Sequence, residues 1–196
     1  MAEDVLEDEV EQIEEEPESP QERARREAAM ARIRRLGDPV LRTRALEVGA
    51  FDSRLREEVD WMRAIMDDAL GIGLAATQIG TLARLLVYRV EPESPTAAVI
   101  NPRIEWRSAE TETMEEGCLS IPGIRVDVER NLHVRVSALD EYGDPRTIEA
   151  SGLEARVIQH EMDHLDGVLI LDRTPRDQRK DAMKALREWQ EQQRSG

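Results

Sequence analysis

The chain has few of the features that mark secreted, membrane-spanning or nucleic-acid-binding proteins. It has a single cysteine, Cys118, among 196 residues, so it cannot form an internal disulfide. It lacks the run of about 18 apolar residues that a membrane-spanning helix requires, and its acidic start is unlike a secretory signal peptide. Its formal net charge of −15 argues against general binding to nucleic acids. We therefore expect a cytoplasmic protein that binds neither membranes nor DNA.

The negative charge is concentrated near the N-terminus. Residues 1–22 contain eleven Asp and Glu residues and no Lys or Arg, whereas residues 23–35 contain six arginines and one glutamate. Charge blocks of this kind bury little surface and tend to stay solvated. We therefore expect residues 1–35 to form a disordered or loosely helical leader, and residues 36–196 to form one catalytic domain. A tail that folds back on its basic neighbour is the alternative.

The apolar pattern of the domain predicts helices and strands in separate stretches. A helix should begin after the capping residues Asp52 and Ser53, because apolar residues recur at helical spacing over residues 55–66. A last helix should begin at Thr174–Pro175 and continue nearly to the C-terminus. Apolar runs or strict alternation predict strands at residues 84–90, 97–104 and 124–139. This separation of antiparallel strands from helices indicates an α+β domain.

A further predicted helix carries the residues best suited to catalysis. Residues 151–154 have the sequence of a capping box, and Gly167 is placed to end the helix. Within it, His160 and His164 lie on one face a turn apart, so both can bind the same metal ion while Glu161 reaches a water bound to that ion. This arrangement suits metal-assisted hydrolysis.

The same helical face also carries Leu153 and Val157, so we expect it to point into the protein. Two buried imidazoles without partners would cost free energy, which favours a metal site over two surface histidines. The remaining histidine, His133, falls on the polar side of a predicted strand, where we expect a solvated side chain.

Two histidines do not complete a tetrahedral site, and the sequence leaves the third protein ligand open. A gluzincin peptidase would use a downstream glutamate, and Glu188 lies far enough along the chain. A metzincin would need a histidine where this chain has Ile170. Cys118 is the other candidate, because its neighbour Gly117 permits close approach of the backbone, although a lone cysteine is commonly a small buried apolar residue.

Three segments together resemble the peptide deformylase family. They are GIGLAATQ at Gly71–Gln78, EGCLS at Glu116–Ser120 and QHEMDH at Gln159–His164, in the order and at the separations of that family. The resemblance extends from about Gly37 to the C-terminal helix. It implies a fold in which antiparallel sheets wrap around the helix that carries HExxH, with a further helix at the C-terminus.

The resemblance also implies an activity and a cofactor. Such an enzyme is a metal-dependent hydrolase that removes the formyl group from the N-terminal formylmethionine of newly synthesised polypeptides. Cys118, His160 and His164 would bind one divalent metal ion, commonly Fe²⁺ in this family, with Zn²⁺, Ni²⁺ or Co²⁺ as alternatives.

The resemblance assigns further roles around the metal. Glu161 would act as general acid and base on the metal-bound water. The Gln78 amide and the Leu119 backbone N–H would stabilise the oxyanion of the tetrahedral intermediate. The residues that would bind the substrate are Ile72, Gly73, Arg125 and Val157, with Leu119 and Val157 shaping a methionine pocket.

Two other functions compete with deformylation: an HExxH endopeptidase, and a metal-binding interaction module without catalysis. Cys118 and Gln78 separate the first from a deformylase, since a gluzincin needs neither. Glu161 disfavours the second, because a structural metal site does not require it.

The last helix carries seven basic residues between Arg173 and Arg194. Contact with the ribosome is one interpretation of this helix, and a solvated face packed through Met183, Leu186 and Trp189 is the one we favour.

Overall fold

Two antiparallel sheets form the framework of the computed structural model, which describes residues 18–195. The larger sheet has the strand order β1-β2-β3-β6-β7, and the smaller one pairs β4 with β5. The strands are β1 (Gly73–Ala75), β2 (Leu85–Tyr88), β3 (Ala97–Arg107), β4 (Thr111–Gly117), β5 (Arg125–Asn131), β6 (His133–Leu139) and β7 (Pro145–Ser151).

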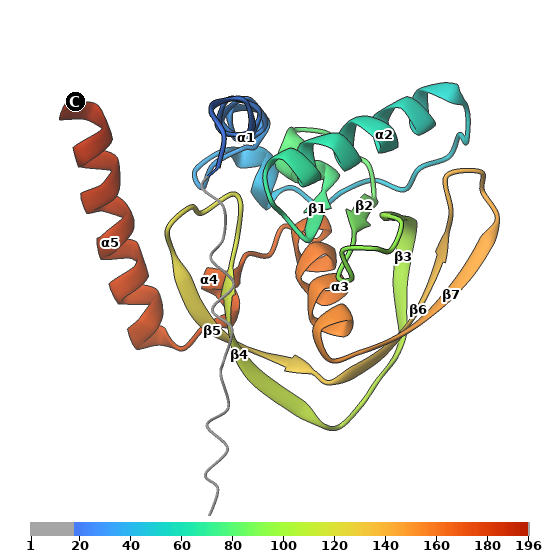
Figure 1. Cartoon of the computed structure of the whole chain (residues 1–196). Helices are drawn as coiled ribbons and strands as arrows, with labels where there is room; N and C mark the ends of the chain where they lie inside the picture. The colour runs from blue at the N-terminus through green and yellow to red at the C-terminus, as the bar shows by residue number, and fades with distance from the viewer. Residues whose placement is uncertain (1–17, 196) are drawn as a thin grey trace, which may run out of the picture.

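The helices surround this framework, except for one in its centre. They are α1 (Pro20–Arg32), α2 (Ser53–Asp68), α3 (Gly152–Leu165), α4 (Ile170–Arg173) and α5 (Arg176–Ser195), with short 3-10 helices η1 (Pro39–Arg42) and η2 (Ala76–Ile79). The two sheets curve around α3, the helix that carries HExxH (Figure 1). The predicted α+β fold, with antiparallel sheets around this helix and a helix at the C-terminus, is confirmed.

Strand β2 shows how the core holds α3 in place. Leu85 and Val87 pack in a cluster with α2, whereas Leu86 and Tyr88 pack in a second cluster with α3. Because both faces of β2 are covered, its sequence is a continuous apolar run instead of an alternation. Burying one large aliphatic side chain contributes roughly 1.5–3 kcal/mol. Packing on β2 therefore fixes α3 from one side.

The alternating stretch at residues 124–139 is two strands and not one. β5 pairs with β4 in the smaller sheet, while β6 pairs with β3 and β7 in the larger sheet. The chain changes sheet at Leu132, whose N–H donates to the carbonyl of Glu110 and whose carbonyl accepts from Gly152. The alternation continues through this point because both strands bury one face, so it gives no sign of the change.

The capping box predicted at residues 151–154 is wrong. Ser151 is the N-cap of α3, but its side chain makes no bond to the helix. Its hydroxyl instead lies 2.8 Å from Nδ1 of His133, and the Glu154 carboxylate accepts a 2.8 Å bond from the Tyr88 hydroxyl. Both polar groups thus bond to neighbouring strands. His133, expected to be solvated, is half-exposed and held by this bond.

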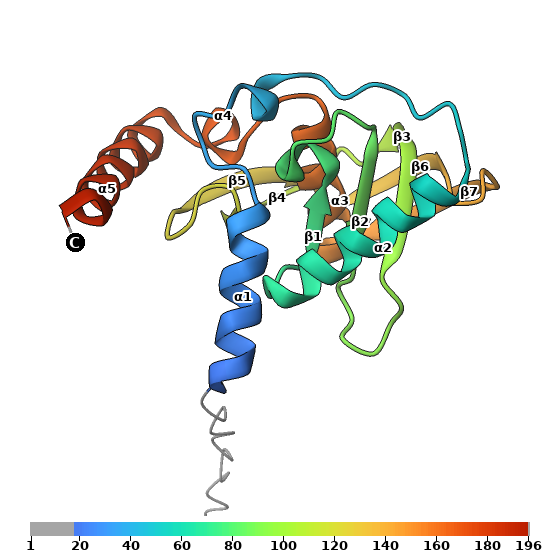
Figure 2. The same ribbon diagram turned by 90° about the horizontal axis from the view of Figure 1, so that it is seen from above.

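The predicted leader falls only partly within the described residues, since residues 1–17 lie outside them. The remainder includes a helix, which is one of the two forms we expected, and this helix packs on the domain. Helix α1 begins with a complete capping box, in which Ser19 and Glu22 exchange bonds, and with Pro20 at its first position. Its Ala29 and the following Ile33 are buried in the same cluster as α2. Figure 2 shows α1 leaving the domain from this attachment point.

Helix α5 packs on the smaller sheet through one face. Ala182 and Leu186 are buried, and Met183 packs beside them, so this part of the packing prediction is confirmed. Trp189 remains 39% exposed and does not belong to that contact. Gln178 anchors the start of the helix, because its side chain bonds the backbone N–H and the carboxylate of Asp127. Among the described residues, we find no helix with the length and apolar character needed to cross a bilayer.

Replacing Ile33 with alanine tests whether α1 belongs to the folded unit. Ile33 is only 4% exposed, so Ile33→Ala should lower the free energy of unfolding by about 2–4 kcal/mol, as cavities in a core do. The matched control is Arg32→Ala, which truncates an exposed side chain and should change stability by less than about 0.5 kcal/mol. Equal denaturant midpoints for both variants would show that α1 is not docked.

Candidate active site

Helix α3 presents its HExxH residues inside the protein. Glu161 is 4% exposed and His164 is 1% exposed, while His160 retains slight access to solvent. As predicted, Val157 is buried on the same side of the helix. Leu153 is 49% exposed, so the expectation that it points inward is wrong, because the first turn of α3 lies at the edge of the fold.

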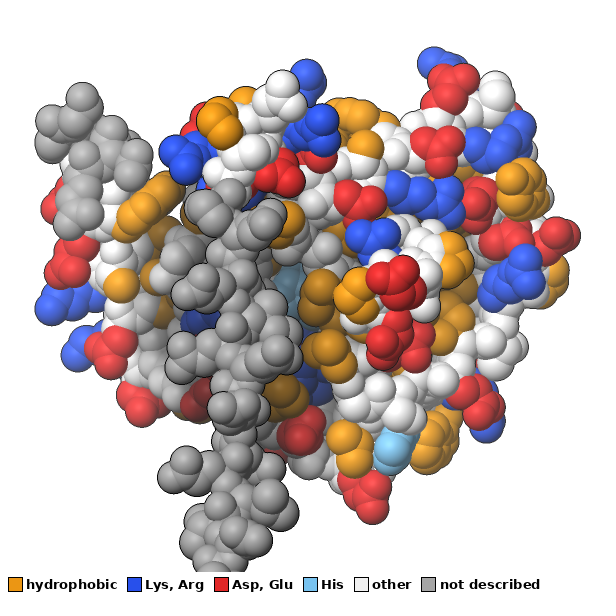
Figure 3. All heavy atoms as spheres, viewed as in Figure 1, with side chains coloured by type: hydrophobic (Ala, Val, Ile, Leu, Met, Phe, Trp, Pro, Cys, Tyr) orange, Lys and Arg blue, Asp and Glu red, His pale blue; other side chains and the backbone are white. Residues whose placement is uncertain are grey.

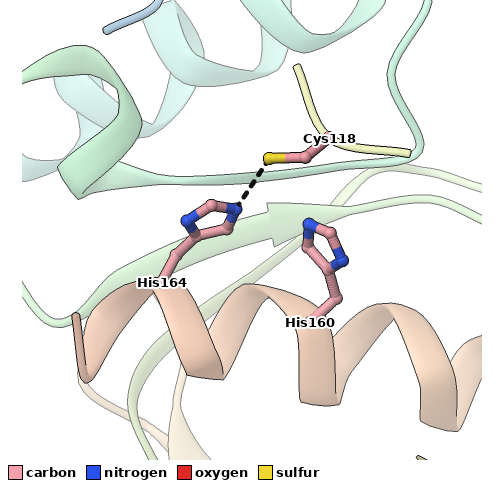
Figure 4. Close-up of side chains that lie close together, drawn as sticks. All are labelled: Cys118, His160 and His164. Carbon is pink, nitrogen blue, oxygen red and sulfur yellow. Dashed lines mark hydrogen bonds between the residues drawn. The ribbon is translucent and has the colours of Figure 1, made fainter. Parts of the chain in front are cut away.

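Cys118, just after β4, lies against the two histidines. Its Sγ is 3.3 Å from Nε2 of His164, and one ligand atom from each of Cys118, His160 and His164 lies within 4.8 Å of the others. Figure 4 shows the two rings rising from consecutive turns of α3 toward the sulfur. Three protein ligands of this kind suit a metal ion with one open coordination position. Glu188 does not join them: its side chain is 60% exposed on α5 and faces Lys184.

The two histidines differ in their ionisation. Burial lowers the pKa of His160, but its bonds to Cys118 and Glu116 outweigh burial and raise the pKa to about 10. His160 must lose this proton before its ring can bind a metal ion, so metal binding here depends on pH. Burial lowers the pKa of His164, which keeps its ring neutral, as a metal ligand must be.

A buried ion-pair network fixes the ring of His160. Glu116 accepts a 2.9 Å bond from Nδ1 of His160, which leaves the other ring nitrogen free to face Cys118. The same carboxylate accepts two bonds from Arg130 and one from Arg156. Burial alone would raise the pKa of Glu116, but the bonds to Arg130 and His160 lower it, so the group stays ionised. Arg130 also donates to Asp163 on α3.

Sequence reasoning missed Arg130 and Arg156, although one signal marks the first. Arg130 falls in phase with Val126 and Val128, on the buried face of β5. An arginine at such a position requires a buried carboxylate partner. Arg156 lies four residues before His160, on the same side of α3, but nothing in the sequence identifies its partner.

Glu161 is held close to strand β1. A side chain at Gly73 would place its Cβ 2.5 Å from Oε1 of Glu161, which is closer than two such atoms can approach. Burial raises the pKa of Glu161 to about 7. Its Oε2 atom is buried with no hydrogen-bond partner among the described residues. The carboxylate is thus poised to exchange a proton near neutral pH and has a free oxygen with which to do so.

Gln78 is fixed in η2 with its amide nitrogen turned toward the cysteine segment. Its Oε1 accepts a 2.9 Å bond from the N–H of Ala75. Its Nε2 donates to the Ser120 hydroxyl at 3.3 Å and lies 3.8 Å from Sγ of Cys118. Because the oxygen is already bonded, the amide points its donor toward the candidate metal site.

A cavity of about 650 Å³ opens beside Cys118 and His160. All four residues predicted to bind substrate lie in its wall, together with Gln78 and Leu119: Ile72, Gly73, Arg125 and Val157. Arg125 is exposed at the rim and pairs with Glu115 at 3.2 Å. On the face of the molecule that Figures 1 and 3 view, hydrophobic side chains gather beside a hollow (Figure 3). The geometry places the protein among metal-dependent hydrolases with an HExxH helix.

Comparison with known proteins gives the family. A model of the polypeptide deformylase family matches residues 30–180. The peptide deformylase of Parafrankia sp. (strain EAN1pec) is 46% identical over 156 residues, which cover 80% of this chain and 85% of that protein. The chain belongs to the polypeptide deformylase family, and is therefore a metal-dependent hydrolase of an amide bond.

Solved structures of the family share the fold. The crystal structure of a peptide deformylase from Synechococcus elongatus in complex with actinonin has a TM-score of 0.76 and 44% identity, covering 78% of this chain and 85% of that one. A peptide deformylase from Legionella pneumophila has a TM-score of 0.78 and 37% identity, covering 84% of this chain and 97% of that one.

Metal content in two variants tests the third ligand. Cys118→Ser should lose most of its bound metal, because a hydroxyl is a poor ligand at neutral pH whereas a thiolate is a strong one. Glu188→Ala should keep the wild-type metal content. Elemental analysis after purification and dialysis measures both. Full metal in Cys118→Ser, or its loss in Glu188→Ala, would contradict the assignment.

Gly73→Ala tests the contact between β1 and Glu161. Because the added methyl would overlap the carboxylate, Glu161 must shift, and kcat should fall by at least about tenfold with metal content unchanged. Gly49→Ala is the matched control, since a methyl there meets nothing within 4 Å. A rise in KM alone would show that Gly73 serves only to admit substrate.

Proposed function

We propose that this chain hydrolyses the formyl amide of N-terminal formylmethionine on newly synthesised polypeptides. The observation that carries the proposal is the meeting of Cys118, His160 and His164. Cys118 and His160 line one cavity together with Gln78, and Glu161 follows His160 on the same helix. An endopeptidase of the gluzincin type is not favoured, because Glu188 lies away from the histidines.

The three residues Cys118, His160 and His164 would hold one divalent metal ion. A thiolate with two imidazoles accepts Fe²⁺, Zn²⁺, Ni²⁺ or Co²⁺, and we propose Fe²⁺ as the resident ion. When bound, the ion supplies a Lewis acid that polarises the formyl oxygen and lowers the pKa of a water molecule. Glu116 orients His160 for this task through the bond to Nδ1.

Glu161 moves the proton in this proposal. Its carboxylate accepts a proton from the attacking water and then gives it to the departing amine of methionine. A pKa near 7, raised by burial, suits both steps. The unpaired Oε2 is the oxygen available to the water. Gly73 has no side chain and so leaves the space that the Glu161 carboxylate occupies.

Gln78 and Leu119 stabilise the negative charge that develops on the formyl oxygen. The Nε2 group of Gln78 already points toward Cys118, because Ala75 holds its Oε1. The backbone N–H of Leu119 would be the second donor, since it directly follows Cys118. Donors held in advance cost no reorganisation when the charge appears, and each contributes about 10²–10³ in kcat.

The substrate peptide would bind along strand β1. This strand is at the edge of the larger sheet, so the backbone of a nascent chain can add to it as a further strand beside Ile72 and Gly73. Leu119 and Val157, both in the cavity wall, would shape an apolar pocket for methionine. Arg125 at the rim would contact the peptide further along.

We further propose that the protein acts in the cytoplasm, where nascent chains appear. Residues 36–196 would form the catalytic domain, with α1 attached to it. The exposed basic residues of α5 would allow contact with ribosomal RNA, and its apolar face is already used for packing.

Formate release from formyl-Met-Ala, compared with cleavage of an unblocked peptide, tests the proposed function. The wild-type protein should release formate, lose this activity with a chelator and leave internal peptide bonds intact. Glu161→Gln keeps the size of the side chain but cannot accept the proton, so its turnover should fall by at least about 10²-fold at unchanged metal content. Internal cleavage without formate release would replace deformylation by endopeptidase activity.

A further inference from the structure

Residues 34–36 connect the two segments that carry the proposed oxyanion donors. The N–H of Arg34 donates to the carbonyl of Gln78 at 2.7 Å. The N–H of Leu36 donates to the carbonyl of Ser120 at 3.0 Å. Between them, Nη1 of Arg35 donates to the carbonyl of Leu119 at 2.8 Å. This short segment therefore holds the Gln78 segment and the cysteine segment at a fixed separation.

The three bonds matter because of the turn that follows Cys118. The N–H of Ile121 donates to the carbonyl of Cys118 at 2.9 Å, which closes the turn. The carbonyls of Cys118, Leu119 and Ser120 thus have donors from Ile121, Arg35 and Leu36 respectively. The Leu119 N–H lies in the same peptide plane as the Cys118 carbonyl, which Ile121 holds. Arg35 and Leu36 hold the two peptide planes that follow, so the three bonds together fix the turn in which the Leu119 N–H lies.

Of these three donors, Arg35 alone acts through its side chain, so it can be removed by substitution. Its Nη2 also donates to the carbonyl of Met30 near the end of α1, at 3.3 Å. The planar guanidinium therefore bonds two carbonyls, one near the end of α1 and one in the turn. Lysine offers a single flexible ammonium and cannot reproduce both bonds with the same geometry.

We propose that Arg35 is a positioning residue for deformylation, which holds the turn at Leu119 so that the Leu119 N–H faces the developing oxyanion. The inference rests on the proposed function, since it requires that Leu119 serve as a donor there. A donor to an oxyanion acts mainly in the transition state, so loosening it lowers kcat and leaves KM nearly unchanged. The metal ligands keep their own contacts.

Kinetics of Arg35→Ala and Arg35→Lys on formyl-Met-Ala test this role. In Arg35→Ala, kcat should fall by about 10- to 10²-fold, the scale of a small misplacement in an active site. KM should change by less than about threefold, and metal content should equal that of the wild type. Arg35→Lys should recover part of the lost kcat, because its ammonium can still reach one carbonyl.

Ile33→Ala is the matched control for loss of stability. It weakens the same attachment of α1 but leaves the guanidinium in place, so its melting temperature should fall while its kcat stays near that of the wild type. Equal losses of kcat in Ile33→Ala and Arg35→Ala, or full kcat in Arg35→Ala, would overturn the inference alone. Absence of formate release from the wild type would overturn the proposed function and the inference with it.

Discussion

The carboxylate of Glu116 is the interaction on which the rest of the site depends. It lies two residues before Cys118 and is bonded by Arg130 of β5 and by Arg156 and His160 of α3. It therefore ties β4, which directly precedes the cysteine, to the helix that carries the histidines. A buried charge is tolerated only when it is fully paired, and removing one partner of such a group costs about 3–5 kcal/mol. The fold itself thus holds the residues of the candidate metal site close together.

The same region leaves two buried polar atoms without partners among the described residues, Oε2 of Glu161 and Nδ1 of His164. Leaving such a group unpaired costs about 1–3 kcal/mol, which is a substantial fraction of the stability of a small domain. In Glu161 the unpaired oxygen is the one that the proposed reaction uses. Burial raises the pKa of this carboxylate to about 7, whereas the paired Glu116 stays ionised. The two glutamates therefore differ in pKa because Glu116 accepts hydrogen bonds from Arg130 and His160, whereas burial dominates at Glu161.

The HExxH helix, the three candidate metal ligands and the family could be predicted from the sequence. Helical spacing places His160 and His164 on one face, and the motif around Cys118 resembles a known one. The partners of Glu116 do not follow, since ion pairs between distant segments leave no periodic signal. The change of sheet at Leu132 could not be predicted either, because β5 and β6 each bury one face and the alternation continues from one strand into the next. The docking of α1 was missed for a different reason. The six arginines of residues 23–35 dominate the composition of this stretch, while Ala29, Met30 and Ile33 make the core contact.

X-ray absorption spectroscopy on the zinc-loaded protein tests the central claim most directly, because it reports the ligand atoms themselves. We predict one sulfur at about 2.3 Å and two imidazole nitrogens at about 2.0–2.1 Å, with a light atom from solvent completing the shell. A shell made only of nitrogen and oxygen, with no sulfur, would contradict it. That result would remove Cys118 from the metal and leave the Glu116 network without the role in metal binding assigned to it.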